Sequence, residues 1–224
     1  MGFWKNYYIL VILLTIATVL SFAWLFLNRK KINAKWWEVL IISLAHTIVG
    51  VGFVKFFALL EAGFDVNKAG NLSMYGGIFF MPIFYFIYAK IKKLPLGLVF
   101  DIFTISLVST LLLARINCLF SGCCLGKNIN YTEARYPTRE LEIGYDVIFL
   151  AISIFFIYKN KFPGKIYLIY LISYGVFRFI IEWMRESNST SAFHIAHVWS
   201  LLAVLIGVGL LVYIYFKNKD KEKQ

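Results

Sequence analysis

The chain has 224 residues, of which 60% are apolar and 19% aromatic, with a formal net charge of +11 and a mean hydropathy of +0.73. This composition is far too apolar for an ordinary soluble domain, and it predicts an integral membrane protein. The lysines lie in short blocks between apolar stretches, as topology signals and contacts with anionic lipids do, so no nucleic acid is expected as a partner.

Seven stretches are long and apolar enough to cross a bilayer, which predicts an all-α integral membrane protein with seven transmembrane helices. The first stretch has no small-residue cleavage site and is too long for a signal peptide, so we expect it to remain as a span. Since no Pro-rich or Ser-rich linker interrupts the chain, residues 1–224 are predicted to form a single multi-span membrane domain. The expected spans are 7–27, 37–60, 75–91, 96–119, 138–158, 165–185 and 195–216.

Lysine-rich connectors alternate with nearly neutral ones along the chain. The lysine-rich ones are 29–35, 90–93, 159–165 and 217–223. By the positive-inside rule these segments are cytoplasmic, which places the N-terminus outside and the C-terminus in the cytoplasm. The other connectors then lie together at the outer face, where any chemistry would meet outer-leaflet lipids or exported substrates. They are 61–76, 115–127 and 182–197.

The third expected span opens with Tyr75-Gly76-Gly77. Two glycines permit the close approach of a ligand or of a neighbouring span, and the free amides of a helix N-terminus can bind an anion. The sequence leaves these interpretations open.

The fourth expected span carries two charges. Arg115 lies near its outer end, where it either anchors the helix at the interface or faces the bundle interior and clamps an anion with its planar guanidinium. Asp101 lies deeper, towards the cytoplasmic end, and a carboxylate there needs a partner that the sequence does not identify.

The three cysteines of the chain, Cys118, Cys123 and Cys124, follow within ten residues of Arg115. Their spacing is not that of a zinc ribbon, so no metal is predicted. A mixed site with His194 and His197, a disulfide and free thiols that pack as small apolar groups remain alternatives.

Two groups of charged residues lie near the outer ends of later spans. Glu142 and Asp146 lie four residues apart near the start of the fifth span, where a helix-capping role alone could explain Glu142. Arg178, Glu182 and Arg185 have the spacing of one helical face in the outer half of the sixth span. Lipid does not tolerate such a stripe, so it should face protein or a cavity, either as a structural ion pair or as part of a site.

Taken together, these motifs resemble the prolipoprotein diacylglyceryl transferase family of bacterial membranes. The family signature Gly-Arg-Ile-x-Asn-Phe-x-Asn-Gly-Glu-x-x-Gly is similar to residues 114–126, in which Arg115, Gly122 and Gly126 match. The family element Arg-Phe-x-x-Glu-x-x-Arg is matched at every defined position by residues 178–185.

Weaker correspondences extend the resemblance over residues 72–201, in the same order and spacing. Asp101 resembles an aspartate of the family, and residues 136–142 resemble His-Pro-Ser-Gln-Leu-Tyr-Glu, with Pro137 and Glu142 in register. The family elements His-Gly-Gly and Gln-x-x-Ser resemble residues 75–77 and 197–200. The departures are Tyr75 for histidine, Cys118 for asparagine, Cys123 for glutamate and His197 for glutamine.

The resemblance implies a transferase that moves the diacylglyceryl group of phosphatidylglycerol to the lipobox cysteine of exported prolipoproteins, the first step of bacterial lipoprotein maturation. Its partners would be phosphatidylglycerol, the prolipoprotein signal peptide and the lipid bilayer, with no cofactor. Its location would be the bacterial cell (inner) membrane, with several spans and the active site towards the outer face. A phospholipid-binding protein on the same fold, without catalysis or with altered specificity, is the alternative.

The resemblance also suggests roles for individual residues. Arg115 would hold the phosphate and Arg178 would be the second cation, while Glu142 and Glu182 would orient the arginines or transfer protons. Tyr75 would replace the missing histidine as a proton carrier. Further residues expected at the substrate are Gly76, Gly77, Asp101, Gly122, Gly126, Arg185 and His197.

Overall fold

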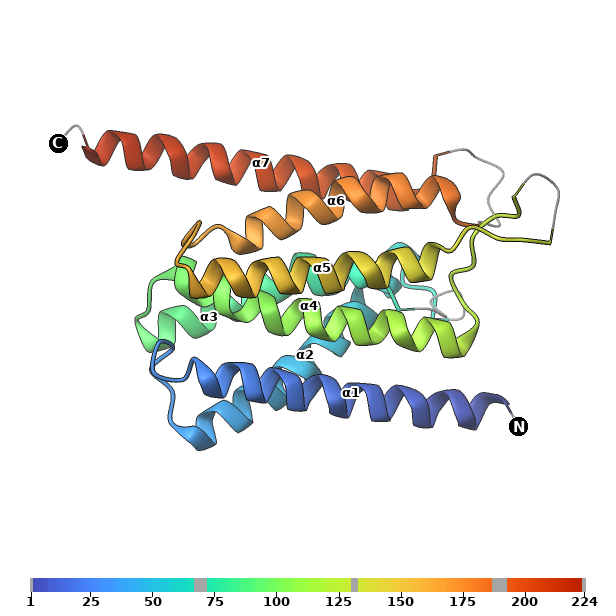
Figure 1. Ribbon diagram of the computed structural model, residues 1–224, viewed down its shortest axis with the longest axis horizontal. Helices are drawn as coiled ribbons and strands as arrows, with labels where there is room; N and C mark the ends of the chain where they lie inside the picture. Colours follow the sequence, from blue (N-terminus) through green and yellow to red (C-terminus); the bar gives the residue numbers. More distant parts are fainter. Residues whose placement is uncertain (1, 67–71, 130–132, 187–192, 223–224) are drawn as a thin grey trace. The chain divides into compact units, whose positions relative to one another are not determined.

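A computed structural model describes residues 2–66, 72–129, 133–186 and 193–222, which fold into seven helices (Figure 1). Seven segments of these helices are long and apolar enough to cross a membrane, and their ends agree with the predicted spans to within two residues. The prediction of an all-α protein with seven transmembrane helices is therefore confirmed. The helices are α1 (Gly2–Leu27), α2 (Trp36–Glu61), α3 (Met74–Lys92), α4 (Leu96–Ser121), α5 (Thr138–Tyr158), α6 (Ile166–Met184) and α7 (Ile195–Glu222).

The described chain divides into two compact units. Unit 1 consists of Met1–Cys123 and Arg139–Gly164, and unit 2 consists of Cys124–Thr138 and Lys165–Gln224. Unit 1 therefore holds α1 to α4 and almost all of α5, whereas α6 and α7 belong to unit 2. The organisation as a single membrane domain remains a prediction from the sequence.

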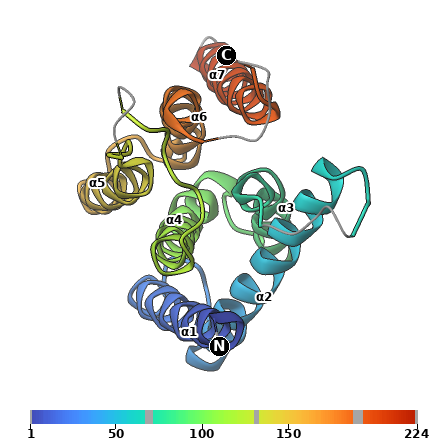
Figure 2. The same ribbon diagram turned by 90° about the vertical axis from the view of Figure 1, so that its right-hand side faces the viewer.

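Helix α4 is the central element of unit 1, with α1, α3 and α5 around it (Figure 2). It begins directly after Pro95, whose ring suits the start of a helix, and it ends at Gly122, which adopts the left-handed conformation (φ 68°) of a helix C-cap. Its inward side contacts an aromatic cluster, in which the ring of Phe103 lies 5.2 Å from Tyr85 and 5.1 Å from Tyr88. Both charges of α4, Asp101 and Arg115, are buried.

The lysine-rich connectors of unit 1 meet at one end of that unit. Lys31 and Lys161 come from two of these connectors, and Pro95 follows the third; all three residues line the same pocket. At this end Lys92 also forms an ion pair with Glu38 (2.8 Å), which joins the end of α3 to the start of α2. The charge alternation of the sequence requires these connectors to share a face, and in unit 1 they do.

Asp101 has a partner that the sequence did not identify. Its carboxylate accepts a hydrogen bond from the backbone N–H of Gly164, in the connector that follows α5. Gly164 has a φ of 75°, and a Cβ atom added to Gly97 would lie only 2.6 Å from its Cα atom. The carboxylate thus holds this connector against the first turns of α4. Arg115, fourteen residues further along α4, lies about 21 Å away along the helix axis, so the structure does not bring these two predicted site residues together.

Unit 2 is a helix pair joined to a loop. Gly175 of α6 faces α7 so closely that a Cβ atom would lie 2.8 Å from the carbonyl oxygen of Ser200, which is the small-residue packing common between membrane helices. The loop after Cys124 pairs with the end of α6, because Lys127 donates its N–H to the carbonyl of Met184 (2.8 Å) and Glu186 donates to that of Leu125 (2.9 Å). The backbone therefore holds the loop of residues 124–128 to the end of α6.

Gly76 has a packing role between α2 and α3. A Cβ atom at this position would lie 2.7 Å from the carbonyl carbon of Phe53, closer than side chains are found in proteins. A Cβ atom at Gly77 would make only ordinary contacts of 3.6 Å, with Val54 among its neighbours. Of the two interpretations of the glycine pair, the close approach of a neighbouring span is the one that the structure shows for Gly76.

We expect Gly76→Ala to lower the free energy of unfolding by about 1–3 kcal/mol, because the added methyl group must push α2 and α3 apart. Gly77→Ala is the matched control and should be neutral or slightly stabilising, because alanine favours helix more than glycine does. Thermal unfolding of the two variants in detergent checks this difference. Equal stability of the two variants would show that the contact between α2 and α3 does not depend on Gly76.

Candidate functional site

A buried ion pair joins α4 to α5 in unit 1. Arg115 Nη1 lies 3.0 Å from Glu142 Oε2, and the two residues are only 5% and 4% exposed. An arginine that anchors a helix at the interface would extend its guanidinium into water, so the burial of Arg115 favours the inward-facing interpretation. In α5 the acidic residue of the first turn is Glu140, so Glu142 lies inside the helix and interacts with Arg115 rather than capping the helix.

The chain builds this pair from two helix ends. Arg115 lies in the last two turns of α4, which stops at Gly122. Glu142 lies one turn after the start of α5 at Thr138, which follows Pro137. Asp146, one turn further along α5, is also buried. Two carboxyl side chains, those of Glu142 and Asp146, are therefore buried one turn apart in α5, and Arg115 pairs with the first of them.

A second buried ion pair lies within α6 of unit 2. Arg178 Nη2 lies 2.6 Å from Glu182 Oε2, and both side chains are less than a tenth exposed. Their spacing of four residues is the one expected from the sequence. Two sets of charged side chains are therefore buried in apolar helices, each with its own counter-ion, as charges within a membrane require.

His197 lies beside this pair of charges on the neighbouring helix α7. Its ring is completely buried and is surrounded by the rings of Phe179, Trp183 and Phe193, at centroid distances of 5.1, 4.8 and 4.8 Å. The backbone N–H of His194 donates to Nδ1 (3.1 Å), so the proton of the neutral imidazole lies on Nε2. Nε2 has no hydrogen-bond partner among the residues that the structure describes.

Arg185 differs from the expected arrangement. The sequence predicted that it shares one helical face with Arg178 and Glu182, but α6 ends at Met184 and Arg185 is an extended residue beyond it (ψ 140°). Its guanidinium lies against the sulfur of Cys124, with Nη2 to Sγ at 2.6 Å. At this point the backbone of Arg185 no longer continues the helix but pairs with Gly126, in the loop between α4 and α5.

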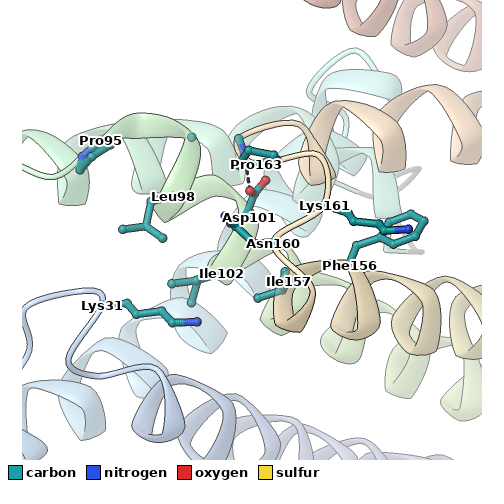
Figure 3. Close-up of a pocket in the computed structure, with 12 residues that line it drawn as sticks. Lys31, Pro95, Leu98, Asp101, Ile102, Phe156, Ile157, Asn160, Lys161 and Pro163 are labelled. Atoms are coloured by element: carbon teal, nitrogen blue, oxygen red, sulfur yellow. Dashed lines mark hydrogen bonds between the residues drawn. The ribbon is translucent and has the colours of Figure 1, made fainter.

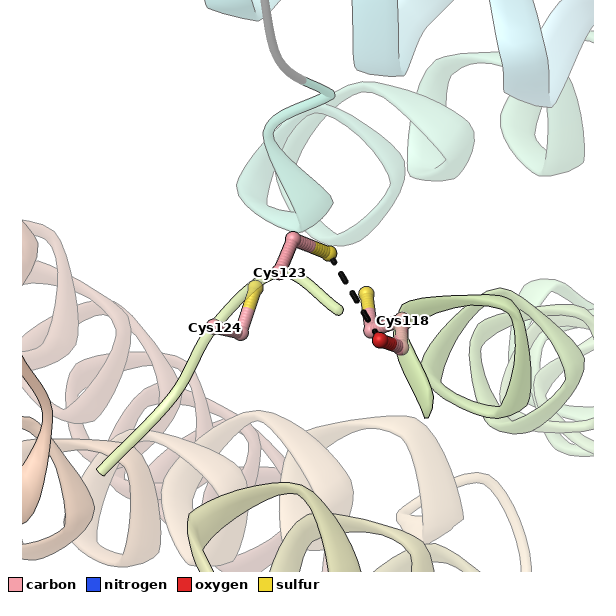
Figure 4. A group of neighbouring side chains, drawn as sticks. All are labelled: Cys118, Cys123 and Cys124. Atoms are coloured by element: carbon pink, nitrogen blue, oxygen red, sulfur yellow. Dashed lines mark hydrogen bonds between the residues drawn. The ribbon is translucent and has the colours of Figure 1, made fainter. Parts of the chain in front are cut away.

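None of the three cysteines forms a disulfide in the described residues, and they do not all have the same environment. Cys118 is buried in the last turns of α4, and Cys123 donates from its sulfur to the carbonyl oxygen of Cys118 (3.9 Å), as Figure 4 shows. The two sulfurs lie within 4.8 Å of each other. Two thiols provide two ligand atoms, whereas a structural zinc site takes four. Cys124 instead belongs with Arg185, and its carbonyl accepts the hydroxyl hydrogen of Thr138 (3.0 Å).

The remaining predicted site residues pack against neighbouring side chains or determine the course of the backbone. Tyr75 is buried at the start of α3, and its ring packs 5.9 Å from Phe79 and 6.3 Å from Phe57. Gly122 provides the left-handed cap of α4. Gly126 lies so close to Tyr136 that an added Cβ atom would be 2.8 Å from the Cβ of that tyrosine.

Reasoning from the sequence missed the contacts of the loop between α4 and α5. These are the contact of Cys124 with Arg185 and an ion pair between Arg135 and Glu186. Both join residues that lie more than fifty positions apart, and no periodicity connects them. The opposite charges of Arg135 and Glu186 were the one available signal.

Comparison with known proteins gives a consistent result. The family model described as Prolipoprotein diacylglyceryl transferase matches residues 3–213. Three relatives are named phosphatidylglycerol–prolipoprotein diacylglyceryl transferase. The alignment with the protein of Dehalococcoides mccartyi has 24% identity over its length of 236 residues, and it covers 95% of this chain and 91% of the relative. That of Tropheryma whipplei is 27% identical over 202 residues (81% and 71%), and that of Staphylococcus carnosus is 34% identical over 94 residues (40% and 34%).

The contact between Arg185 and Cys124 predicts a reactive thiol, because a neighbouring cation favours the thiolate, which is the nucleophilic form. In a background with Cys118→Ser and Cys123→Ser, Arg185→Gln should slow the alkylation of Cys124 by a water-soluble maleimide about three- to tenfold at neutral pH. Arg135→Gln removes a cation from the same loop without touching the sulfur, and it should leave the rate unchanged. Equal rates in the two variants would remove Arg185 from the environment of this thiol.

Proposed function

Because the chain belongs to the prolipoprotein diacylglyceryl transferase family, we propose that it transfers the diacylglyceryl group of phosphatidylglycerol to the lipobox cysteine of an exported prolipoprotein. The observation that carries this proposal is the buried pair of Arg115 and Glu142, with their 3.0 Å contact. A guanidinium kept charged in an apolar helix is suited to a phosphate, whose oxygens match its planar fork.

The reaction exchanges one bond for another. The sulfur of the acceptor cysteine attacks the glyceryl carbon that carries the phosphate ester, and a C–S bond forms while the C–O bond breaks. The bonding electrons leave with glycerol phosphate, and the thiol proton passes to a base. Negative charge therefore grows on the leaving phosphate, and a preorganised cation in a water-poor site lowers the barrier by several kcal/mol, about 3–4 for one such donor.

Arg115 would provide that cation. Glu142 holds the guanidinium through Nη1, and the planar fork of N–H donors in this group matches the oxygens of a phosphate. The carboxylate would thus orient the arginine and balance its charge before the lipid arrives. Arg178, oriented in the same way by Glu182, would be the second cation.

The proton-transfer groups depart from the family pattern. Tyr75 stands where the family has histidine, and a phenol, which titrates near ~10, is a poor base at neutral pH. His197 is better described as a donor, since its Nε2 carries the hydrogen while Nδ1 accepts from His194. Glutamine, which the family has at this position, is also a donor, so we assign His197 to substrate binding.

The location follows from the charge pattern. The lysine-rich connectors would face the cytoplasm, so Arg115 would lie towards the outer face of the bacterial cell membrane. There the site would meet phosphatidylglycerol of the outer leaflet and the signal peptides of exported precursors.

Tyr75 and Cys123 also support the alternative, a phospholipid-binding protein of the same family without this chemistry. Purified protein in phosphatidylglycerol vesicles, incubated with a lipobox peptide, distinguishes the two. Thioether-linked diacylglyceryl peptide supports the transferase, whereas bound lipid without product over many hours supports the binding protein.

Arg115→Lys keeps the charge but loses the planar fork, so we expect transfer to fall by about 10²-fold or more while the protein remains folded. Arg115→Ala would leave Glu142 buried without its partner and would destabilise the protein by about 3–5 kcal/mol. The double change Arg115→Met with Glu142→Gln avoids that cost and should fold without activity.

The control for these variants is Arg29→Ala. Arg29 lies in the connector that follows α1 and stacks on Phe26 of that helix (4.4 Å). It should transfer lipid at the normal rate. Wild-type rates in Arg115→Lys would remove Arg115 from the site.

Cys123→Ser tests whether the thiol that stands at the family's glutamate position takes part. We expect transfer within about twofold of wild type, because the hydrogen bond from the Cys123 sulfur to a carbonyl oxygen at 3.9 Å is weak and a serine hydroxyl can also donate to that oxygen. Initial rates of peptide lipidation provide the measurement, with Cys118→Ser as the matched control. A loss of more than tenfold that is confined to Cys123→Ser would contradict this and assign the thiol a chemical role.

A further inference from the structure

Unit 1 has a pocket of about 380 Å³ at its lysine-rich end, shown in Figure 3. Its walls come from the connector after α1, the first two turns of α4, and the end of α5 with the segment that follows it. The pocket therefore lies where these helices leave the apolar part of the membrane, at the depth of lipid headgroups.

The charges of the pocket favour an anion. Lys31 and Lys161 stand at its exposed rim, on either side of Ile102 and Ile157 in Figure 3. The one acidic residue of the lining, Asp101, is buried and bound to the backbone N–H of Gly164. Two exposed lysines thus border the pocket, while the carboxylate is already engaged with the chain.

The rest of the lining is apolar. Leu98 and Ile102 come from α4, and Phe156 and Ile157 come from α5. A free inorganic anion gains nothing from such walls. An anionic phospholipid would place its phosphate between the two lysines and the first carbons of an acyl chain against the isoleucines, so it uses both kinds of surface.

We propose that this pocket binds the headgroup of an anionic phospholipid of the leaflet at the lysine-rich end of the protein. The site is distinct from that of the proposed reaction, because Asp101 lies about 21 Å from Arg115 along α4. A lipid bound here would hold the connectors after α1 and α5 against α4. It would add to the contact that the Asp101 carboxylate makes with Gly164.

The test uses the full-length protein in nanodiscs of phosphatidylcholine that contain a small fraction of phosphatidylglycerol with a photoreactive group beside the headgroup. After irradiation, mass spectrometry measures the yield of cross-links on peptides that contain residues 95–102 and 156–161. The position of the cross-link separates this pocket from a lipid bound near Arg115. Lys31→Gln with Lys161→Gln should reduce the yield about 25-fold, because each of the two lysines near a headgroup contributes roughly fivefold to affinity.

The matched control is Lys30→Gln with Lys159→Gln, which removes two exposed lysines from the same connectors without changing the lining. Its yield should stay within about twofold of wild type, and excess inorganic phosphate should not compete. An equal yield with a photoreactive phosphatidylcholine, or an equal loss in the control variant, would overturn the proposal. Full competition by inorganic phosphate would also overturn it and assign the pocket to the free anion.

Discussion

The structure depends on the cost of placing charge inside an apolar helix bundle. Arg115 and Glu142 are each almost fully buried, and either one alone would be a strongly unfavourable charge in a membrane. Together they are neutral and lie at 3.0 Å, which couples the last turns of α4 to the first turns of α5. On general grounds, two leucines in place of this pair would leave the protein no less stable. The presence of the pair is therefore better explained by a functional role than by stability.

The two buried charges of α4, one near each end of the helix, are balanced by different kinds of partner. At one end the Arg115 guanidinium is matched by a side-chain carboxylate, and at the other the Asp101 carboxylate is matched by the backbone N–H of Gly164. The first arrangement keeps a guanidinium charged in an apolar helix, which is what the proposed binding of a phosphate requires. The second engages the carboxylate in holding a connector, and the role of Asp101 at a substrate remains a prediction. Exposed lysines line the same pocket as Asp101. Because the Asp101 carboxylate is engaged with the backbone, these lysines can bind an anionic lipid without competition from it.

The residues that depart from the family signature also differ from one another in their contacts. Cys118 and Cys123 are small, weakly polar side chains near the end of α4, and they cost little when buried. Cys124 is different, because its sulfur contacts the guanidinium of Arg185. His197 keeps the donor character of the family's glutamine, since His194 occupies the other nitrogen of the ring. Chemistry that depends on a hydrogen-bond donor can therefore be retained at the position of His197.

Hydropathy and helical period predicted the number of spans, their ends and the spacing of Arg178 and Glu182, because these patterns act over neighbouring residues. The sequence also identified Arg115 and Glu142 as candidates, through their cost in an apolar segment and their family motifs. That these two are partners, and that Asp101 is bound to Gly164, became clear from the structure. The structure also moved Arg185 off the face of α6 and into contact with Cys124. Each of these contacts joins residues between 27 and 63 positions apart, and their formation depends on how separate helices and loops pack, which no local pattern records.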